Sequence, residues 1–183
     1  LPISSTGHLL IAEKLGLGAR SDVFNIVIQA GAILAVTVIY WLRLWQLAMN
    51  VRTPENKDYA LKLTVAFLIT AVLGVIVSKL GFKLPKEVTP IAWALIIGGV
   101  WIIFAEWYAA KKPESSTITW PVAIVVGIAQ IVAGIFPGTS RSGATIFAAM
   151  LVGTNNRAAA TEFAFLIGIP TMYAASAKRI YGA

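Results

Sequence analysis

The sequence predicts an all-α fold: a polytopic membrane helical bundle with inverted-topology repeats and re-entrant helix pairs. Three observations support this prediction. Hydrophobic residues make up 58% of the 183 residues and charged residues only 13%, whereas soluble domains carry about 25% charged residues. Several apolar stretches approach the roughly 20 residues that a bilayer-spanning helix needs. Two short segments rich in proline, serine and glycine interrupt the apolar sequence. We therefore treat residues 1–183 as a single integral membrane domain.

Four long apolar stretches are predicted to cross the bilayer. The first three run from about Val23 to Trp45, from Ala60 to Val77 and from Pro90 to Tyr108. Tryptophan and tyrosine side chains gather at the far end of the first span and along the third, which is typical of the interface between lipid and water. The last span is expected from about Thr161 to Ala177, with a kink at Pro170.

A different kind of segment is predicted before the last span. Apolar sequence from Trp120 to Phe136 is broken by PGTSRSG at residues 137–143, and a second short apolar helix continues to about Val152. Irregular backbone at membrane depth requires protein or a water-filled cavity to satisfy its N–H and C=O groups. We therefore expect a re-entrant helix hairpin.

An internal repeat links this break to the start of the chain. LPISSTG at residues 1–7 resembles FPGTSRSG at residues 136–143, and each is followed about twenty residues later by a span that opens on phenylalanine, at Phe24 and Phe163. If both breaks are re-entrant, the two spans are antiparallel, as in an inverted repeat whose site lies where the broken helices meet. Repeat one covers about residues 1–45 and repeat two about residues 120–178.

Arg141 is the residue with the clearest chemical meaning. An isolated arginine inside an apolar hairpin is costly at membrane depth, so it requires an anionic partner. Ser142 stands where a helix is expected to begin, and the N–H groups and dipole at a helix N-terminus favour anions. A guanidinium can also grip phosphate in a bidentate way. The pattern favours a phosphate site; the alternatives are that Arg141 reaches the interface or pairs with a structural carboxylate such as Glu162.

The first break supplies hydroxyl groups and the one histidine of the sequence. His8 follows Ser-Ser-Thr-Gly, and the repeat places this turn opposite Arg141. A phosphate between Arg141 and His8 would meet a positive clamp on one side and a base, acid or nucleophile on the other. A structural role for His8 is the alternative. Gln29, in the middle of the first span, is either a contact between helices or a weaker site candidate.

Composition excludes several classes of site. The sequence has no cysteine and one histidine, so it offers neither a Cys-ligated nor a His-rich metal centre, and no metal site is visible in these residues. The net charge is +7, but the basic residues are scattered singly through loops. We attribute them to contacts with anionic lipid headgroups and expect no nucleic-acid partner.

At this point the sequence resembles a known family. SSTGH at residues 4–8 and PGTSRSGAT at residues 137–145 are similar to the motifs of the undecaprenyl-diphosphate phosphatase family, the bacitracin-resistance type, and the similarity covers nearly the whole chain. The resemblance implies hydrolysis of undecaprenyl diphosphate to undecaprenyl phosphate and inorganic phosphate. This reaction recycles the lipid carrier for cell-wall synthesis. It also implies a multi-pass protein of the bacterial inner membrane whose site opens toward the periplasm.

The resemblance further implies roles for individual residues. The expected catalytic residues are Ser5, His8 and Arg141, and the expected substrate-binding residues are Arg141, Ser140, Ser142, Thr145, Thr6 and Gln130. His8 and Ser5 would sit at the reacting phosphorus, and the nucleophile stays open: either of them or neither, with a metal-activated water and a Ser5 assisted by an upstream glutamate both possible. The family carries a glutamate-rich motif just before the segment that matches Leu1. It implies dependence on Mg²⁺ or Ca²⁺ with ligands upstream of Leu1, so we expect this stretch alone to be inactive.

Two rival interpretations are kept. A non-enzymatic transporter or flippase of a lipid phosphate would also use inverted repeats and broken helices. A type 2 phosphatidic-acid phosphatase needs a second histidine after the arginine motif, and no histidine follows Arg141. The expected partners are an isoprenoid lipid diphosphate and membrane lipid, and a homodimer is left open.

Overall fold

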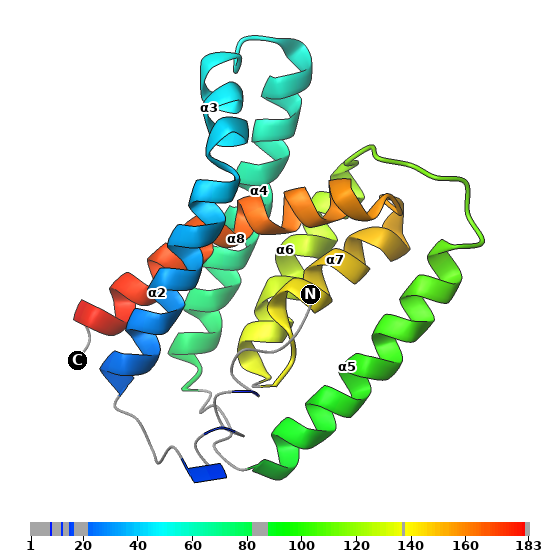
Figure 1. Ribbon diagram of the computed structural model, residues 1–183. Coiled ribbons are helices and arrows are strands. Elements are labelled where there is room, and N and C mark those ends of the chain that lie inside the picture. The colour runs from blue at the N-terminus through cyan, green and yellow to red at the C-terminus, as the bar shows by residue number, and fades with distance from the viewer. Residues whose placement is uncertain are drawn as a thin grey trace.

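The computed structural model describes residues 8, 12, 15–16, 22–81, 88–136 and 138–181. Their regular structure is helical, with no strand among them, which confirms the predicted all-α class. Three helices are long and apolar enough to cross a membrane, and a bent pair would make a fourth span. The helices longer than a single turn are α2 (Asp22–Ile39), α3 (Trp41–Met49), α4 (Pro54–Lys79), α5 (Val88–Ala109), α6 (Trp120–Ile135), α7 (Arg141–Val152) and α8 (Arg157–Tyr181) (Figure 1).

The first predicted span, Val23 to Trp45, is bent in the structure. Helices α2 and α3 meet at an angle of 59°, with Tyr40 between them. The Tyr40 ring lies 6.0 Å from the ring of Phe165 on α8. Just beyond it, Arg43 Nε donates to the carboxylate of Glu162 at 2.8 Å. The bend thus accompanies contacts with a helix more than a hundred residues away, which hydrophobic periodicity cannot show.

The three other predicted spans appear as single helices. Helix α4 begins before the predicted Ala60, with Pro54 in its first turn, where proline costs no hydrogen bond. Helix α5 matches the third predicted span closely. Helix α8 begins before the predicted Thr161, after Asn156, whose Oδ1 accepts from Ala159 N at 3.0 Å. It continues through Pro170 as one helix, so that proline does not end the span.

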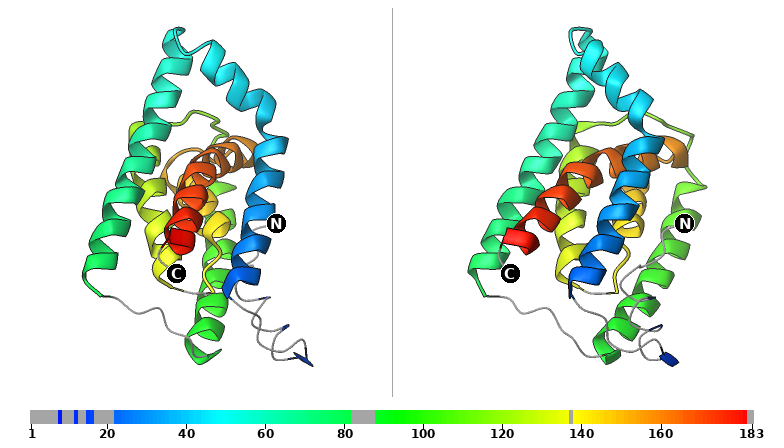
Figure 2. Two further views of the ribbon diagram at one scale, coloured as in Figure 1. Left: turned by 90° about the vertical axis from the view of Figure 1, so that its left-hand side faces the viewer. Right: turned by 60° about the vertical axis from the view of Figure 1, so that its left-hand side comes forward.

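The predicted hairpin is present as α6 and α7, which lie side by side and run in opposite directions (Figures 1 and 2). Their 16 and 12 residues correspond to about 24 and 18 Å at 1.5 Å per residue. Both lengths fall short of the roughly 30 Å hydrocarbon core. A helix pair of this size fits a segment that enters the bilayer and returns, as the sequence predicts.

The core of the protein lies around this hairpin. Helix α6 packs on α4, and α7 packs on α5 and α8. The tightest approach is at Gly127 of α6, where an added Cβ would lie only 2.7 Å from the Ala66 carbonyl oxygen of α4. Thr70 of α4 also donates to the Gly127 carbonyl oxygen at 2.9 Å. Small residues let two membrane helices approach this closely.

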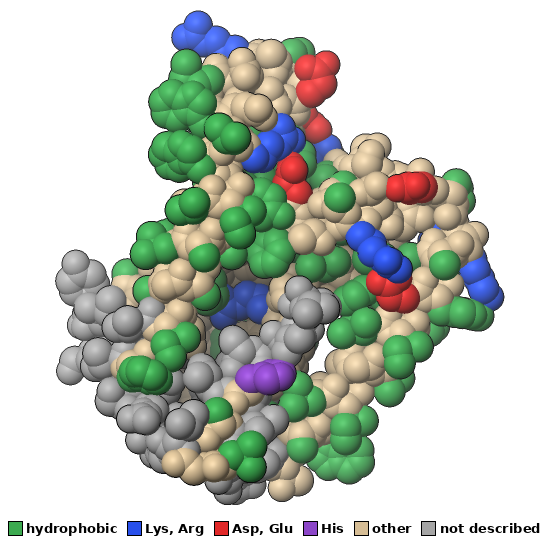
Figure 3. Space-filling model, in the orientation of Figure 1, with side chains coloured by type: hydrophobic (Ala, Val, Ile, Leu, Met, Phe, Trp, Pro, Cys, Tyr) green, Lys and Arg blue, Asp and Glu red, His purple; other side chains and the backbone are tan. Residues whose placement is uncertain are grey.

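The outer surface carries large apolar side chains, as expected of a protein surrounded by lipid. Helix α5 exposes a long series of them, among them Trp93, Ile97, Val100 and Ile103. Figure 3 shows hydrophobic side chains over α2, α3 and α5 on one face of the molecule. On a soluble protein an exposed apolar surface of this extent would promote association, whereas in a bilayer it contacts acyl chains.

Helices α2 and α8 contain the phenylalanine-led spans of the two predicted repeats, and they pack against one another. They run in opposite directions in each view (Figures 1 and 2). This direction fits the antiparallel relation expected for spans that begin near Phe24 and Phe163. The first break, residues 1–7, lies outside the described residues. The inverted repeat and its limits, about residues 1–45 and 120–178, therefore stay a prediction.

Candidate functional site

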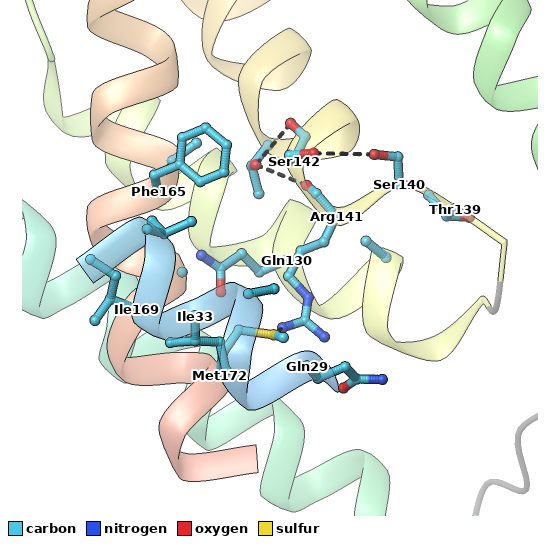
Figure 4. Close-up of a pocket in the computed structure, with 16 residues that line it drawn as sticks. Gln29, Ile33, Gln130, Thr139, Ser140, Arg141, Ser142, Phe165, Ile169 and Met172 are labelled. Atoms are coloured by element: carbon cyan, nitrogen blue, oxygen red, sulfur yellow. Dashed lines mark hydrogen bonds between the residues drawn. The ribbon is translucent and has the colours of Figure 1, made fainter. Parts of the chain in front are cut away.

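A cavity of about 250 Å³ lies between α2, α6, α7 and α8 (Figure 4). Figure 3 shows a hollow between α2 and the α6–α7 hairpin with Lys or Arg atoms on its floor. Five of the eight residues that the family resemblance assigns to catalysis or substrate binding line the cavity together. The polar lining consists of Gln29, Gln130, Thr139, Ser140, Arg141, Ser142 and Thr145. The rest of the lining is apolar, so polar groups are concentrated at the break in the hairpin.

The break is held by the capping of α7. Ser140 is the N-cap, and its Oγ accepts from Gly143 N at 3.1 Å. The Ser140 and Ser142 hydroxyl oxygens are 3.2 Å apart. Thr145 Oγ1 donates to the Arg141 carbonyl oxygen at 2.8 Å. Arg141 is thus the first residue of α7, one position before the start expected from the sequence. The positive end of the helix dipole lies at the cavity, where it favours an anion.

Arg141 reaches into the cavity from this helix end. Its guanidinium contacts the Met172 sulfur on α8, and the residue is half-buried. Glu162, the carboxylate considered as a structural partner, lies elsewhere: it accepts from Arg43 Nε at 2.8 Å and from the Tyr59 hydroxyl at 3.3 Å. The structure thus assigns Glu162 to the contact between α3, α4 and α8, outside the cavity lining.

Two glutamines face the same cavity. Gln130 is only 3% exposed, and neither its amide nitrogen nor its amide oxygen has a hydrogen-bond partner among the described residues. Gln29 is half-buried. In Figure 4 the Arg141 guanidinium lies between the side chains of Gln29 and Gln130. Gln29, the weaker candidate from the sequence, therefore joins the site.

The residues predicted at the first break are not placed in this cavity. His8 is described, and its side chain is exposed, but it is not among the residues that line the cavity. Ser5 and Thr6 lie outside the described residues. The prediction that His8 and Arg141 share one phosphate-sized space is therefore neither confirmed nor contradicted.

Sequence reasoning missed one polar residue of the lining, Thr139, and the apolar lining residues on α8, among them Phe165, Ile169 and Met172. Thr139 lies inside the break itself, and its place between Gly138 and Ser140 was enough to predict it as a site residue. Phe165 and Met172 belong to α8. With Ile169 they follow a spacing of four and three residues, so they share one helix face. That spacing identifies a face of α8 but not the helix that it meets.

The lining does not form a divalent-cation site by itself. Its described polar groups are amides, hydroxyls and one guanidinium, whereas Mg²⁺ and Ca²⁺ are typically held by carboxylates. Among the described residues there is also no group of three or more His, Asp or Glu side chains that could hold a metal ion. We therefore derive no step through a metal ion at these residues.

Comparisons with known proteins place the chain in a family. A family model described as "Bacitracin resistance protein BacA" matches residues 1–183. The chain is 76% identical over 176 residues to an undecaprenyl-diphosphatase of Rhizobium etli, covering 96% of this chain and 66% of that protein. It is 75% identical to one of Rhizobium johnstonii, covering 98% and 68%.

A more distant relative gives the same result. The undecaprenyl-diphosphatase of Xanthomonas oryzae pv. oryzae is 62% identical over 176 residues, covering 96% of this chain and 66% of that protein. The chain thus spans about two thirds of the length of the curated relatives that it matches. Because the family model covers every residue, the chain belongs to the bacitracin resistance protein BacA family.

Proposed function

We propose that this protein hydrolyses undecaprenyl diphosphate to undecaprenyl phosphate and inorganic phosphate in the bacterial inner membrane. The relatives named above are undecaprenyl-diphosphatases. The observation that carries the proposal is the position of Arg141: a guanidinium at the N-terminus of α7, beside the capping hydroxyl of Ser140, in a cavity that is otherwise lined by apolar side chains apart from two glutamines and neighbouring hydroxyls.

This arrangement suits a phosphate attached to a hydrocarbon chain. Arginine presents parallel N–H donors that match phosphate oxygens, and it stays charged when partly buried. Charge attraction is stronger in such a site than in water because the surroundings have a lower dielectric constant. On the opposite side, Ile33, Phe165 and Ile169 offer an apolar surface that fits an isoprenoid chain.

Within the proposal, Arg141 holds the diphosphate and neutralises charge that develops on its oxygens during cleavage. The hydroxyls of Thr139 and Ser142 line the same space and can donate to the phosphate. His8 and Ser5 at the reacting phosphorus, the requirement for Mg²⁺ or Ca²⁺, and a homodimer remain proposals that rest on the family resemblance. Phosphate release measured with and without a chelator tests the cation requirement. The size of the protein particle in detergent tests the homodimer.

The central test is phosphate release from a C55 isoprenyl diphosphate by the full-length protein in detergent. We expect Arg141→Ala to lower kcat/KM by at least about 100-fold, since single transition-state donors are commonly worth that much. Arg141→Lys should recover little, because an ammonium cannot bind in a bidentate way. Arg52→Ala, at an exposed loop position, is the control and should match the wild type.

Two results would count against the proposal. One is wild-type turnover in an Arg141→Ala variant that still inserts into the membrane. The other is counterflow of a lipid phosphate across vesicles with no hydrolysis, which would favour the transporter interpretation.

A further inference from the structure

Gln130 presents an energetic anomaly within the cavity. Both polar atoms of its amide are buried and lack a partner among the described residues. Buried polar groups in native proteins are nearly always hydrogen-bonded, and an unsatisfied one calls for an explanation. Replacing such an amide by an apolar side chain of the same shape is close to neutral or even stabilising. Folding alone therefore does not require a glutamine here.

The position of the amide indicates what its partner is. Gln130 lines the cavity together with Arg141. Figure 4 shows its amide directed away from the break, toward the side where Ile33 and Ile169 lie, while the Arg141 guanidinium lies nearer the break. A bound molecule that extends from Arg141 to the apolar side of the cavity would therefore lie next to the Gln130 amide.

We propose that Gln130 binds the phosphate nearer the isoprenoid chain, while Arg141 and the N-terminus of α7 bind the terminal phosphate. This inference rests on the proposed function and adds a direction of binding and a basis for selectivity. The Nε2 group donates to an oxygen of the inner phosphate, and Oε1 accepts from water in the cavity. A monophosphate has a single charged group, which takes the Arg141 position because the guanidinium supplies a full charge. Gln130 then distinguishes a diphosphate from a monophosphate.

The test compares two probes, farnesyl diphosphate and farnesyl monophosphate, bound to the full-length protein in detergent. Dissociation constants are measured by calorimetry or ligand-dependent thermal shift. The wild type should prefer the diphosphate. In Gln130→Met the ratio of the two affinities should fall about 10- to 100-fold, because one hydrogen bond to a charged group is lost, while monophosphate binding stays unchanged.

Stability measured without ligand provides a second, independent readout. Gln130→Met should melt at the wild-type temperature or above it, because no intramolecular bond among the described residues is removed. Gln130→Leu tests the same expectation with a different shape. Gln46→Met, at an exposed position on α3, is the matched control and should change neither the affinity ratio nor the melting temperature.

The outcomes separate this inference from the proposed function. If the wild type binds neither probe, or Arg141→Ala binds both as the wild type does, the proposed function fails. If Arg141→Ala loses both probes but Gln130→Met and Gln130→Leu keep the wild-type ratio, only the role of Gln130 is overturned. A lower melting temperature in both variants with an unchanged ratio would assign Gln130 to the structure instead of to the ligand.

Discussion

The contact between α4 and α6 yields a prediction with a built-in control. A Cβ added at Gly127 would lie 2.7 Å from the Ala66 carbonyl oxygen and 3.2 Å from the Cβ of Ile69. Ala66 is fully buried, so the atoms it would meet belong largely to backbone that cannot move aside without separating the helices. Gly134, on the same helix, has nothing within 4 Å of an added Cβ.

The expected effect of Gly127→Ala follows from three contributions. Overpacking costs about 1–3 kcal/mol. Weakening the hydrogen bond from Thr70 to the Gly127 carbonyl oxygen costs about 1 kcal/mol more. The better helix propensity of alanine returns about 1 kcal/mol. Gly134→Ala receives only the last contribution. The free energies of unfolding of the two variants should therefore differ by about 2–4 kcal/mol, with Gly127→Ala the less stable.

The assay is unfolding of the full-length protein in mixed micelles, followed by circular dichroism or thermal aggregation. Comparing two glycine-to-alanine changes on one helix cancels effects of the detergent and of composition. Equal midpoints for the two variants would refute the close approach of α4 and α6. Because Gln130 lies one turn after Gly127, we also expect Gly127→Ala to weaken binding in the cavity.

Two further substitutions test the surroundings of the site. Gly138 has φ +99°, and an added Cβ would lie 2.8 Å from the Ile91 carbonyl oxygen. Gly138→Ala should therefore lower the free energy of unfolding by about 2 kcal/mol or more and reduce phosphate release, because the start of α7 is displaced. Unchanged thermal stability and turnover would contradict this expectation. The Asn155 side chain accepts from Ser115 N at 2.6 Å and donates to the Ala109 carbonyl oxygen at 3.2 Å. Asn155→Ala should lower the free energy of unfolding by about 1–3 kcal/mol, measured by denaturation, and should leave KM nearly unchanged in steady-state kinetics. A variant as stable as the wild type would show that these hydrogen bonds are dispensable.

Much of the site was predictable because it is local in the chain. Ser140, Arg141, Ser142 and Thr145 occupy one helix start, and the geometry of a capped helix turn places them together whatever surrounds it. The class of protein was also predictable, since an 18-residue apolar run has few alternatives to a membrane helix. The short lengths of α6 and α7 follow from the proline and glycine between them.

Other features of the fold depend on which helices pack against each other, and hydrophobic periodicity does not indicate the packing partner of a membrane helix. Helix α5 is apolar on nearly all sides, because lipid and protein interior favour the same side chains. Periodicity then gives no sign of its inner face. The bend at Tyr40 and the place of Gln29 beside Arg141 arise in the same way from contacts with distant helices.

The sequence by itself determined that this is a helical membrane protein, and it predicted a helix start beside Arg141 that suits an anion. Only the tertiary structure decided what faces that helix start: an amide from α6, an amide from α2 and an apolar wall from α8. The physical reason is that residues one turn apart are positioned by covalent geometry, whereas helices far apart in the chain are positioned by packing, which is a property of the assembled bundle.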